Sequence, residues 1–198
     1  MKVLLTCFEP FGGNATNVSS EVASTFSPHS IEGSEIVVVQ LPVSFKRVGK
    51  ILSQLIELHR PDIILMLGQA GNREKISIER IAVNLMDSKM GDNDGYCPNE
   101  QSIVAGAENA FFSNMPLKKI VENWHNTGIE AIISNSAGLY VCNCTLYNAL
   151  YLAYHKGLDC KIGFIHLPKI KDIEHKQTIL EQMHKAVKIA IESTILYI

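Results

Sequence analysis

Apolar residues follow two patterns along this chain: short uninterrupted runs, and longer stretches in which they recur every three or four positions. The runs predict buried strands, because a strand covered on both faces has no polar side. The helical spacing predicts helices that bury one face. The predicted strands cover 3–7, 35–41, 62–67, 128–135 and 160–167, and the predicted helices cover 19–26, 45–58, 117–125, 144–155 and 173–196.

The order of these elements predicts the fold class. Strands and helices alternate from the first residues onward, which is typical of a sheet with helices on both faces. We therefore predict an α/β fold: a single three-layer domain, residues 1–198, with a mostly parallel twisted sheet flanked by helices. Residues 76–85 break the pattern, because Glu79 and Arg80 interrupt an apolar segment. Residues 87–100 are polar and form the longest predicted loop, and such loops are often functional.

Charge and hydropathy narrow the possible partners. The 198 residues carry 18 Lys and Arg against 20 Asp and Glu, a net charge of −2. Because no basic surplus is available to neutralise phosphates, we expect no nucleic acid partner. No apolar run approaches the ~20 residues of a membrane span, and the N-terminal apolar run is too short for a signal peptide. We therefore expect a cytoplasmic protein without membrane contact, whose five cysteines are reduced.

Ligands of parallel α/β sheets collect at the carboxyl ends of the strands. Four clusters of small or polar residues follow predicted strands, at 9–13, 68–71, 134–143 and 166–168. The fold class therefore predicts a functional site where these four clusters meet.

Two cysteines lie near the start of a predicted helix, one in the third cluster and one directly after it. Unsatisfied N–H groups and the macrodipole at a helix N-terminus stabilise a thiolate, so Cys142 or Cys144 is a candidate nucleophile. Asn143 between them is a candidate N-cap. The alternative is that both cysteines are small core residues. A zinc site is the weaker interpretation, since no second ligand pair completes four ligands.

His166 and Glu79 are candidates for the groups that would activate such a thiol. A cysteine nucleophile needs a base, and the base needs a third group to orient it. His166 ends a predicted strand at the same edge of the sheet, although a histidine there can also be a core residue. Glu79 is a carboxylate in an apolar segment and needs a partner. Arg80 points to the opposite face of a strand, which favours a partner elsewhere, with His166 as one candidate.

The chain resembles the pyrrolidone-carboxylate peptidase (pyroglutamyl peptidase I) family of cysteine peptidases nearly from end to end. The resemblance rests on several motifs in the same order along the sequence. They are residues 8–13 (FEPFGG), 17–19 (NVS), 68–71 (GQAG), 78–80 (IER) with Asn84, 134–138 (SNSAG), 140–143 (YVCN) and 163–168 (GFIHLP).

The resemblance implies a fold related to purine nucleoside phosphorylases and the removal of N-terminal pyroglutamate from peptides, without a cofactor or a metal. It implies Cys142 as the nucleophile, His166 as the general base and Glu79 as the group that orients the histidine. Cys144 is then an ordinary residue of the first helical turn. The family also implies a homo-oligomer, a tetramer or a dimer.

The implied substrate has a shape that further residues of these motifs would fit. Pyroglutamate is an uncharged lactam with two flat faces and a polar amide edge. Phe8 and Phe11 would cover the faces, and Val141 would close the pocket. Gln69 and Asn17 would match the amide edge, because each side-chain amide carries a donor and an acceptor.

Several positions depart from the family pattern. Cys7 and Asn72 stand where the family usually has Gly, and Leu139 stands where it has Thr. Lys89 stands where it has Arg, which keeps a positive charge near the expected oxyanion but loses the planar fork of donors. Two alternatives follow: a Cys/His hydrolase of another small amide or lactam, and a non-catalytic small-ligand binding protein of the same fold.

Overall fold

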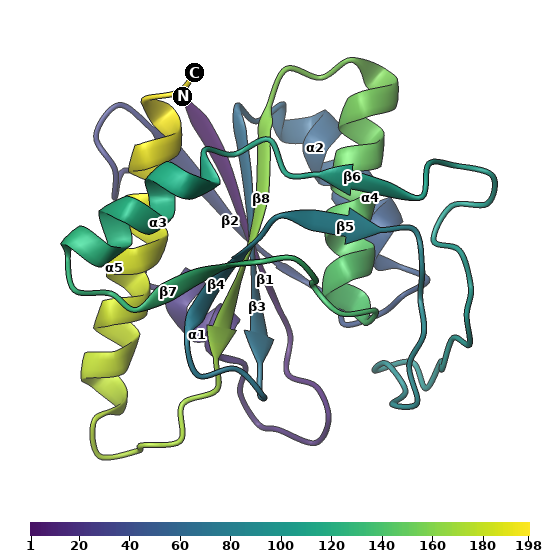
Figure 1. Ribbon diagram of the computed structural model, residues 1–198, viewed down its shortest axis with the longest axis horizontal. Coiled ribbons are helices and arrows are strands. Elements are labelled where there is room, and N and C mark those ends of the chain that lie inside the picture. The colour runs from purple at the N-terminus through teal and green to yellow at the C-terminus, as the bar shows by residue number, and fades with distance from the viewer.

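The computed structural model describes residues 1–198, and it consists of a central sheet between two layers of helices (Figure 1). The central sheet has six strands, and a separate ribbon has two. The sheet strands are β1 (Lys2–Phe8), β2 (Glu35–Leu41), β3 (Ile63–Ala70), β4 (Ile76–Glu79), β7 (Ala131–Ser134) and β8 (Lys161–Pro168), and the ribbon strands are β5 (Ile81–Val83) and β6 (Ala110–Phe112). The helices are α1 (Val18–Ala23), α2 (Val48–His59), α3 (Leu117–Asn126), α4 (Val141–Lys156) and α5 (Lys176–Ile195).

The sheet order is β2-β1-β3-β8-β4-β7. The first four strands in this order are parallel to one another. Strands β4 and β7 are parallel to each other, but β4 is antiparallel to β8. The prediction of an α/β fold with a mostly parallel sheet is therefore confirmed, with two antiparallel strands at one edge.

The uninterrupted apolar runs occur because the central strands are covered on both faces. Along β1, Val3 and Leu5 join a core that contains side chains of α1, α3 and α5, whereas Leu4 and Phe8 join a second core with α2 and α4. Figure 1 shows the same division, with α3 and α5 on one side of the sheet and α2 and α4 on the other. All residues of β3 except Gln69 are buried, which is why no polar alternation marks it.

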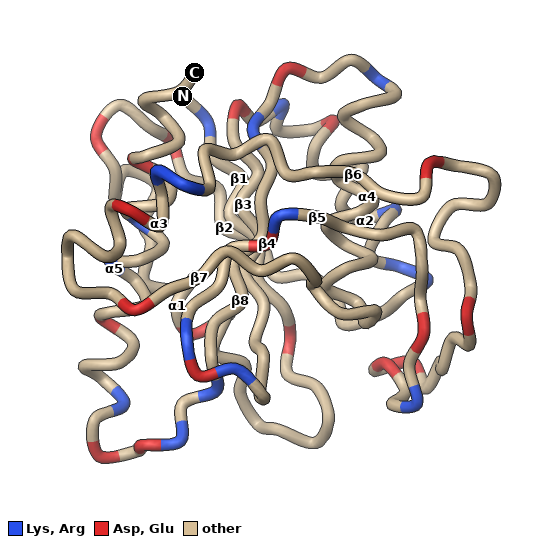
Figure 2. Tube along the Cα trace, in the orientation of Figure 1, with Lys and Arg blue, Asp and Glu red and all other residues tan.

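Charged residues lie mainly outside this sandwich. Figure 2 shows basic and acidic residues interspersed along the loops and at the ends of the helices, rather than separated into two faces. None of the five helices combines the length and the hydropathy that a membrane span requires.

Several predicted elements have boundaries that differ from those observed. The helix expected at 45–58 begins at Val48, the helix expected at 173–196 begins at Lys176, and the strand expected at 128–135 covers only Ala131–Ser134. Element ends are weakly marked in a sequence because capping and tertiary contacts decide them. The segment 76–85 divides at Arg80 into β4 of the main sheet and β5 of the ribbon. Strand β6 has no counterpart among the predicted elements.

The N-cap expected at Asn143 is wrong. Helix α4 begins at Val141, three residues before the predicted start, and its N-cap is Tyr140. Asn143 lies inside the first turn, with only 1% of its surface exposed. Its side chain accepts a hydrogen bond from the Val83 N–H (3.0 Å) and donates to the carbonyl oxygens of Val83 (2.9 Å) and Leu85 (3.0 Å). The amide thus joins α4 to β5 instead of capping the helix.

The predicted long loop 87–100 is present and is held firmly. The buried Asp92 carboxylate accepts hydrogen bonds from the backbone N–H groups of Phe45 (2.9 Å), Asp94 (3.0 Å) and Tyr96 (2.9 Å). The Asn93 side chain donates to the Glu9 carboxylate at 2.8 Å. These bonds fix the loop to the segments that follow β1 and β2, so it can form one wall of a site.

We predict that Asn143→Ala lowers the free energy of unfolding by roughly 2–4 kcal/mol, because buried backbone groups of β5 lose their partners. Urea denaturation measures the effect, and Asn126→Ala at the exposed end of α3 is the control, expected within about 0.5 kcal/mol of the parent protein. Equal stability of the two variants would contradict the role of Asn143 as the link between α4 and β5.

Candidate active site

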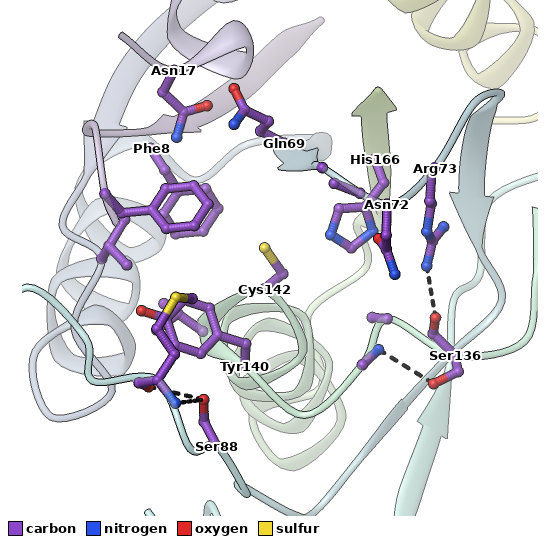
Figure 3. A pocket seen from close by; sticks show the side chains of 18 residues that line it. Phe8, Asn17, Gln69, Asn72, Arg73, Ser88, Ser136, Tyr140, Cys142 and His166 are labelled. Carbon is purple, nitrogen blue, oxygen red and sulfur yellow. Dashed lines mark hydrogen bonds between the residues drawn. The ribbon is translucent and has the colours of Figure 1, made fainter. Parts of the chain in front are cut away.

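A cavity of about 490 Å³ opens where the loops after β1 and β3 meet the N-terminus of α4 (Figure 3). Its lining includes Phe8, Phe11 and Asn17, residues 69–73, Ser88 and Met90, residues 136–138 and 140–142, and His166. Each of the four clusters expected to form the site contributes at least one residue. Because β7 is antiparallel to β8, the carboxyl-end rule does not explain the third cluster, which reaches the cavity through the loop that leads to α4.

Cys142 lies in the first turn of α4, and its half-buried thiol lines the cavity. The backbone N–H groups of this turn have no carbonyl four residues earlier to bind within the helix, so they are available to an anion. The backbone of Gly68 lies close to this thiol. A Cβ atom at Gly68 would lie 3.0 Å from the Cys142 sulfur and 2.7 Å from the Phe164 ring. Glycine at position 68 therefore leaves the space that the thiol occupies.

His166 is paired with Gly68 in the sheet, which puts the imidazole beside the same space. Its Nδ1 atom lies 2.8 Å from Oε1 of Glu79, and both side chains are buried. A carboxylate only accepts hydrogen bonds, so Nδ1 carries the proton and Nε2 is left as an acceptor. Figure 3 shows the imidazole and the Cys142 side chain facing the same part of the cavity.

Strand pairing explains how Glu79 reaches His166. Strand β4 runs antiparallel to β8 and pairs Ser77 with His166. Residues two apart on a strand share a face, so Glu79 lies on the same face as Ser77 and His166. The expectation that Glu79 binds a partner other than Arg80 is confirmed.

Arg73 is the main residue of the site that the sequence analysis missed. Its Nη1 atom donates to Oε1 of Glu79 at 2.6 Å and also to the Ser77 hydroxyl. Its Nη2 atom donates to the Ser136 carbonyl oxygen at 2.8 Å. The second carboxylate oxygen of Glu79 is buried without a partner. The sequence contained one signal for this contact: Arg73 is a cation six residues before Glu79, and a carboxylate buried in an apolar segment requires a compensating charge.

Burial keeps the thiol and the imidazole in their neutral forms. It raises the pKa of the Cys142 thiol to about 12, with a further increase from the Glu79 charge and an opposing effect from Arg73. Burial also lowers the pKa of His166, against the hydrogen bond and the charge of Glu79, while the Arg73 charge lowers it further. At neutral pH the thiol therefore still carries its proton, and the imidazole is free to accept it.

One end of the cavity is apolar and aromatic. Phe8 and Val141 are buried there, and Phe11 packs against Tyr140 with ring centroids 6.1 Å apart. Tyr140, which the sequence analysis named only as part of a motif, also donates a hydrogen bond to the Gly91 carbonyl oxygen at 3.0 Å. These rings provide flat surfaces for a small cyclic group.

Gln69 and Asn17 both line this end, but they differ in what they can offer. The Asn17 oxygen caps α1 by accepting from the N–H (3.0 Å) and the hydroxyl (2.8 Å) of Ser19, and its nitrogen donates to the Glu9 carbonyl oxygen. The Gln69 oxygen accepts from the Val18 N–H at 3.0 Å. The amide nitrogen of Gln69 therefore stays available as a donor, whereas Asn17 mainly supports the wall.

Lys89 does not line the cavity, which corrects the expectation that it contributes a positive charge to the site near the oxyanion. Ser88 and Met90 on either side of it do line the cavity, whereas Lys89 is exposed. The Ser88 hydroxyl donates to the Met90 carbonyl oxygen at 2.9 Å and accepts from the Met90 N–H at 3.2 Å. This turn directs Met90 toward the site and Lys89 to solvent. The sequence pattern of the loop does not contain that information.

Fold and site together define a cysteine-type hydrolase. A family model for pyroglutamyl peptidase matches residues 1–197. The pyrrolidone-carboxylate peptidase of Thermococcus kodakarensis is 43% identical over 200 residues, which cover 97% of this chain and 95% of that protein. That of Thermosipho africanus is 47% identical over 168 residues, covering 85% and 82%. The chain therefore belongs to the pyroglutamyl peptidase family.

Solved structures agree with this assignment. The crystal structure of pyrrolidone carboxyl peptidase from Pyrococcus furiosus is 40% identical in sequence and matches with a TM-score of 0.93, covering 100% of this chain and 99% of that one. The family resemblance stated from the motifs is thereby confirmed.

We predict that Gly68→Ala lowers the free energy of unfolding by about 1–3 kcal/mol, because the added methyl group overlaps the Phe164 ring and the Cys142 sulfur. Gly71→Ala, three residues further along, is the matched control, since a Cβ there meets nothing within 4 Å. Chemical denaturation of both variants measures the difference. If Gly68→Ala were as stable as Gly71→Ala, the close approach at Gly68 would be refuted.

Proposed function

We propose that this protein removes the N-terminal pyroglutamyl residue from peptides, with Cys142 as nucleophile, His166 as general base and Glu79 as the group that orients His166. One observation carries the proposal: the carboxylate-bound imidazole and the thiol at a helix N-terminus line the same cavity. The family membership supports the choice of substrate. Peptides with N-terminal pyroglutamate are thus the proposed partners.

The first half of the reaction forms a thioester. The Cys142 proton moves to Nε2 of His166 while the sulfur attacks the pyroglutamyl carbonyl carbon. Backbone N–H groups in the first turn of α4 stabilise the oxyanion that results. His166 then gives its proton to the leaving nitrogen, the C–N bond breaks, and the peptide departs with a free amino terminus.

The second half hydrolyses the thioester. His166, neutral again, accepts a proton from a water molecule whose oxygen attacks the thioester carbon. The C–S bond breaks, the sulfur recovers the proton from His166, and pyroglutamate leaves as a free acid. Glu79 remains a carboxylate throughout and stabilises the imidazolium that forms twice per cycle.

The lactam fits the end of the cavity that holds Phe8, Phe11 and Val141. The aromatic side chains there cover its flat faces, and the Gln69 nitrogen donates to its ring carbonyl oxygen. The substrate has no free α-amine, so this end of the cavity needs no carboxylate to bind one. A proline residue has a ring of the same size but a charged amine and no ring carbonyl, so it would leave the Gln69 donor unpaired.

Two alternatives to this activity have less support. The hydrolysis of another small amide was suggested by the altered residues around Lys89, but Lys89 does not line the cavity. A binding protein without catalysis would not require the buried His166–Glu79 pair, which is costly to maintain in an apolar environment.

Three further expectations from the sequence stay predictions: a single domain over residues 1–198, a cytoplasmic location, and assembly into a dimer or tetramer. Exposed aromatic side chains on β6 and α4, Phe112 (67% exposed) and Tyr154 (66% exposed), are consistent with an interface between copies. In contrast, Met115 and the buried face of α5 belong to the core.

We predict that Cys142→Ala lowers the cleavage of a pyroglutamyl arylamide by at least about 1000-fold, because no other group supplies the nucleophile. Release of the arylamine from reduced protein is measured, with a prolyl arylamide as a substrate that should not react. Cys144→Ala is the matched control, since this thiol lies two residues further on in the core and does not line the cavity. Full activity of Cys142→Ala would eliminate the proposed nucleophile.

We predict that Arg73→Met shifts the acid limb of the kcat/KM profile to higher pH. The reaction requires neutral His166, and the Arg73 charge lowers the pKa of His166, so its removal raises that pKa. Arg73→Lys keeps the charge and should return the limb toward the parent position. The full pH profile of each variant is the measurement. A loss of rate without any shift of the limb would indicate that Arg73 acts on structure alone.

A further inference from the structure

The cavity has a second end, which the lactam does not use. At about 490 Å³ it is within the range that holds drug-sized molecules, so it exceeds the needs of one five-membered ring. Figure 3 shows Phe8, Asn17 and Gln69 on one side of Cys142, and Asn72, Arg73 and Ser136 on the other. The second side is polar, and His166 lies at its border.

Proton transfer from His166 to the leaving nitrogen determines which part of the substrate lies at the polar end. His166 must give its proton to the leaving nitrogen, so this nitrogen and the chain beyond it have to lie on the His166 side of the reacting carbon. The residues that follow pyroglutamate are thus directed over Asn72, Arg73 and Ser136. This step rests on the function proposed above.

Arg73 and Ser136 already have partners within the protein. Arg73 donates to Glu79 and to the Ser136 carbonyl oxygen, and the Ser136 hydroxyl accepts from the Gly138 N–H at 3.2 Å. The Ser134 hydroxyl adds two more bonds to Ser136, accepting from its N–H and donating to its carbonyl oxygen. This wall of the cavity is therefore rigid, and its polar groups largely bind one another.

Asn72 differs from these neighbours. Its side chain is exposed and lines the same cavity as His166, and it forms no hydrogen bond to the other residues drawn in Figure 3. Its backbone φ is not in the left-handed region, so a side chain is tolerated there without strain. A side-chain amide offers a donor and an acceptor in one plane, which matches the C=O and N–H groups of an extended peptide.

We propose that Asn72 binds the main chain of the leaving peptide. Its amide nitrogen donates to the carbonyl oxygen of the second residue after pyroglutamate, and its amide oxygen accepts from the N–H group of that same residue, because the N–H and C=O groups of one residue point to the same side of an extended chain. The substrate class that follows is pyroglutamyl peptides of at least three residues. Because the contacts are made with main-chain groups, they favour a peptide over an arylamide without selecting side chains.

The test compares two substrates across three proteins. A pyroglutamyl tripeptide amide has the carbonyl and N–H groups that Asn72 would bind, whereas a pyroglutamyl arylamide has neither. For Asn72→Ala we expect kcat/KM on the tripeptide amide to fall about three- to tenfold, the worth of one or two exposed hydrogen bonds, with the arylamide unchanged. Asn135→Ala is the matched control, because this exposed amide lies in the neighbouring loop and does not line the cavity.

The two substrates distinguish a failure of the Asn72 assignment from a failure of the proposed function. Equal kcat/KM losses on both substrates, or no loss on either, would overturn the assignment of Asn72 while the pyroglutamyl peptidase activity stands. The same selective loss in Asn135→Ala would also overturn it, since the effect would not depend on the cavity. If the parent protein cleaved neither substrate, the proposed function would fail and the inference with it.

Discussion

The site depends on one buried negative charge, that of Glu79. An uncompensated carboxylate in this position would be costly, and the protein compensates it with two partners on the same oxygen, Arg73 at 2.6 Å and His166 Nδ1 at 2.8 Å. The two partners have different consequences. His166 acquires a fixed orientation and tautomer, whereas Arg73 supplies a positive charge that lowers the pKa of the imidazole. A neutral, oriented imidazole is the result.

A second constraint is the approach of α4 to the sheet. Gly68 has no side chain, and the first turn of α4 brings the Cys142 sulfur into the space that a Cβ would occupy. The same turn presents unpaired N–H groups to the cavity, and Asn143 ties it to β5. The proposed nucleophile and oxyanion donors are therefore held by one rigid element, which would maintain their mutual distance through the reaction.

The cavity walls come from loops that hydrogen bonds hold in place rather than from the sheet itself. Asp92 and Asn93 fix the 87–100 loop, Asn17 caps α1, and Arg73 fixes the loop before α4. As a result, the apolar and polar ends of the cavity lie on opposite sides of Cys142 (Figure 3). A substrate with a flat apolar ring and a peptide tail matches this division.

Hydrophobic patterning alone determined the α/β class, most of the strands and helices, and the four clusters that meet at the site, because burial of the central strands on both faces leaves uninterrupted apolar runs. Motifs further indicated Cys142, His166 and Glu79. Only the tertiary structure decided the direction of β4 and β7, the start of α4 at Val141, the Arg73 contact with Glu79 and the exposure of Lys89. These features depend on contacts between residues far apart in the chain or on the shape of a loop, and neither has a periodic pattern in a single sequence.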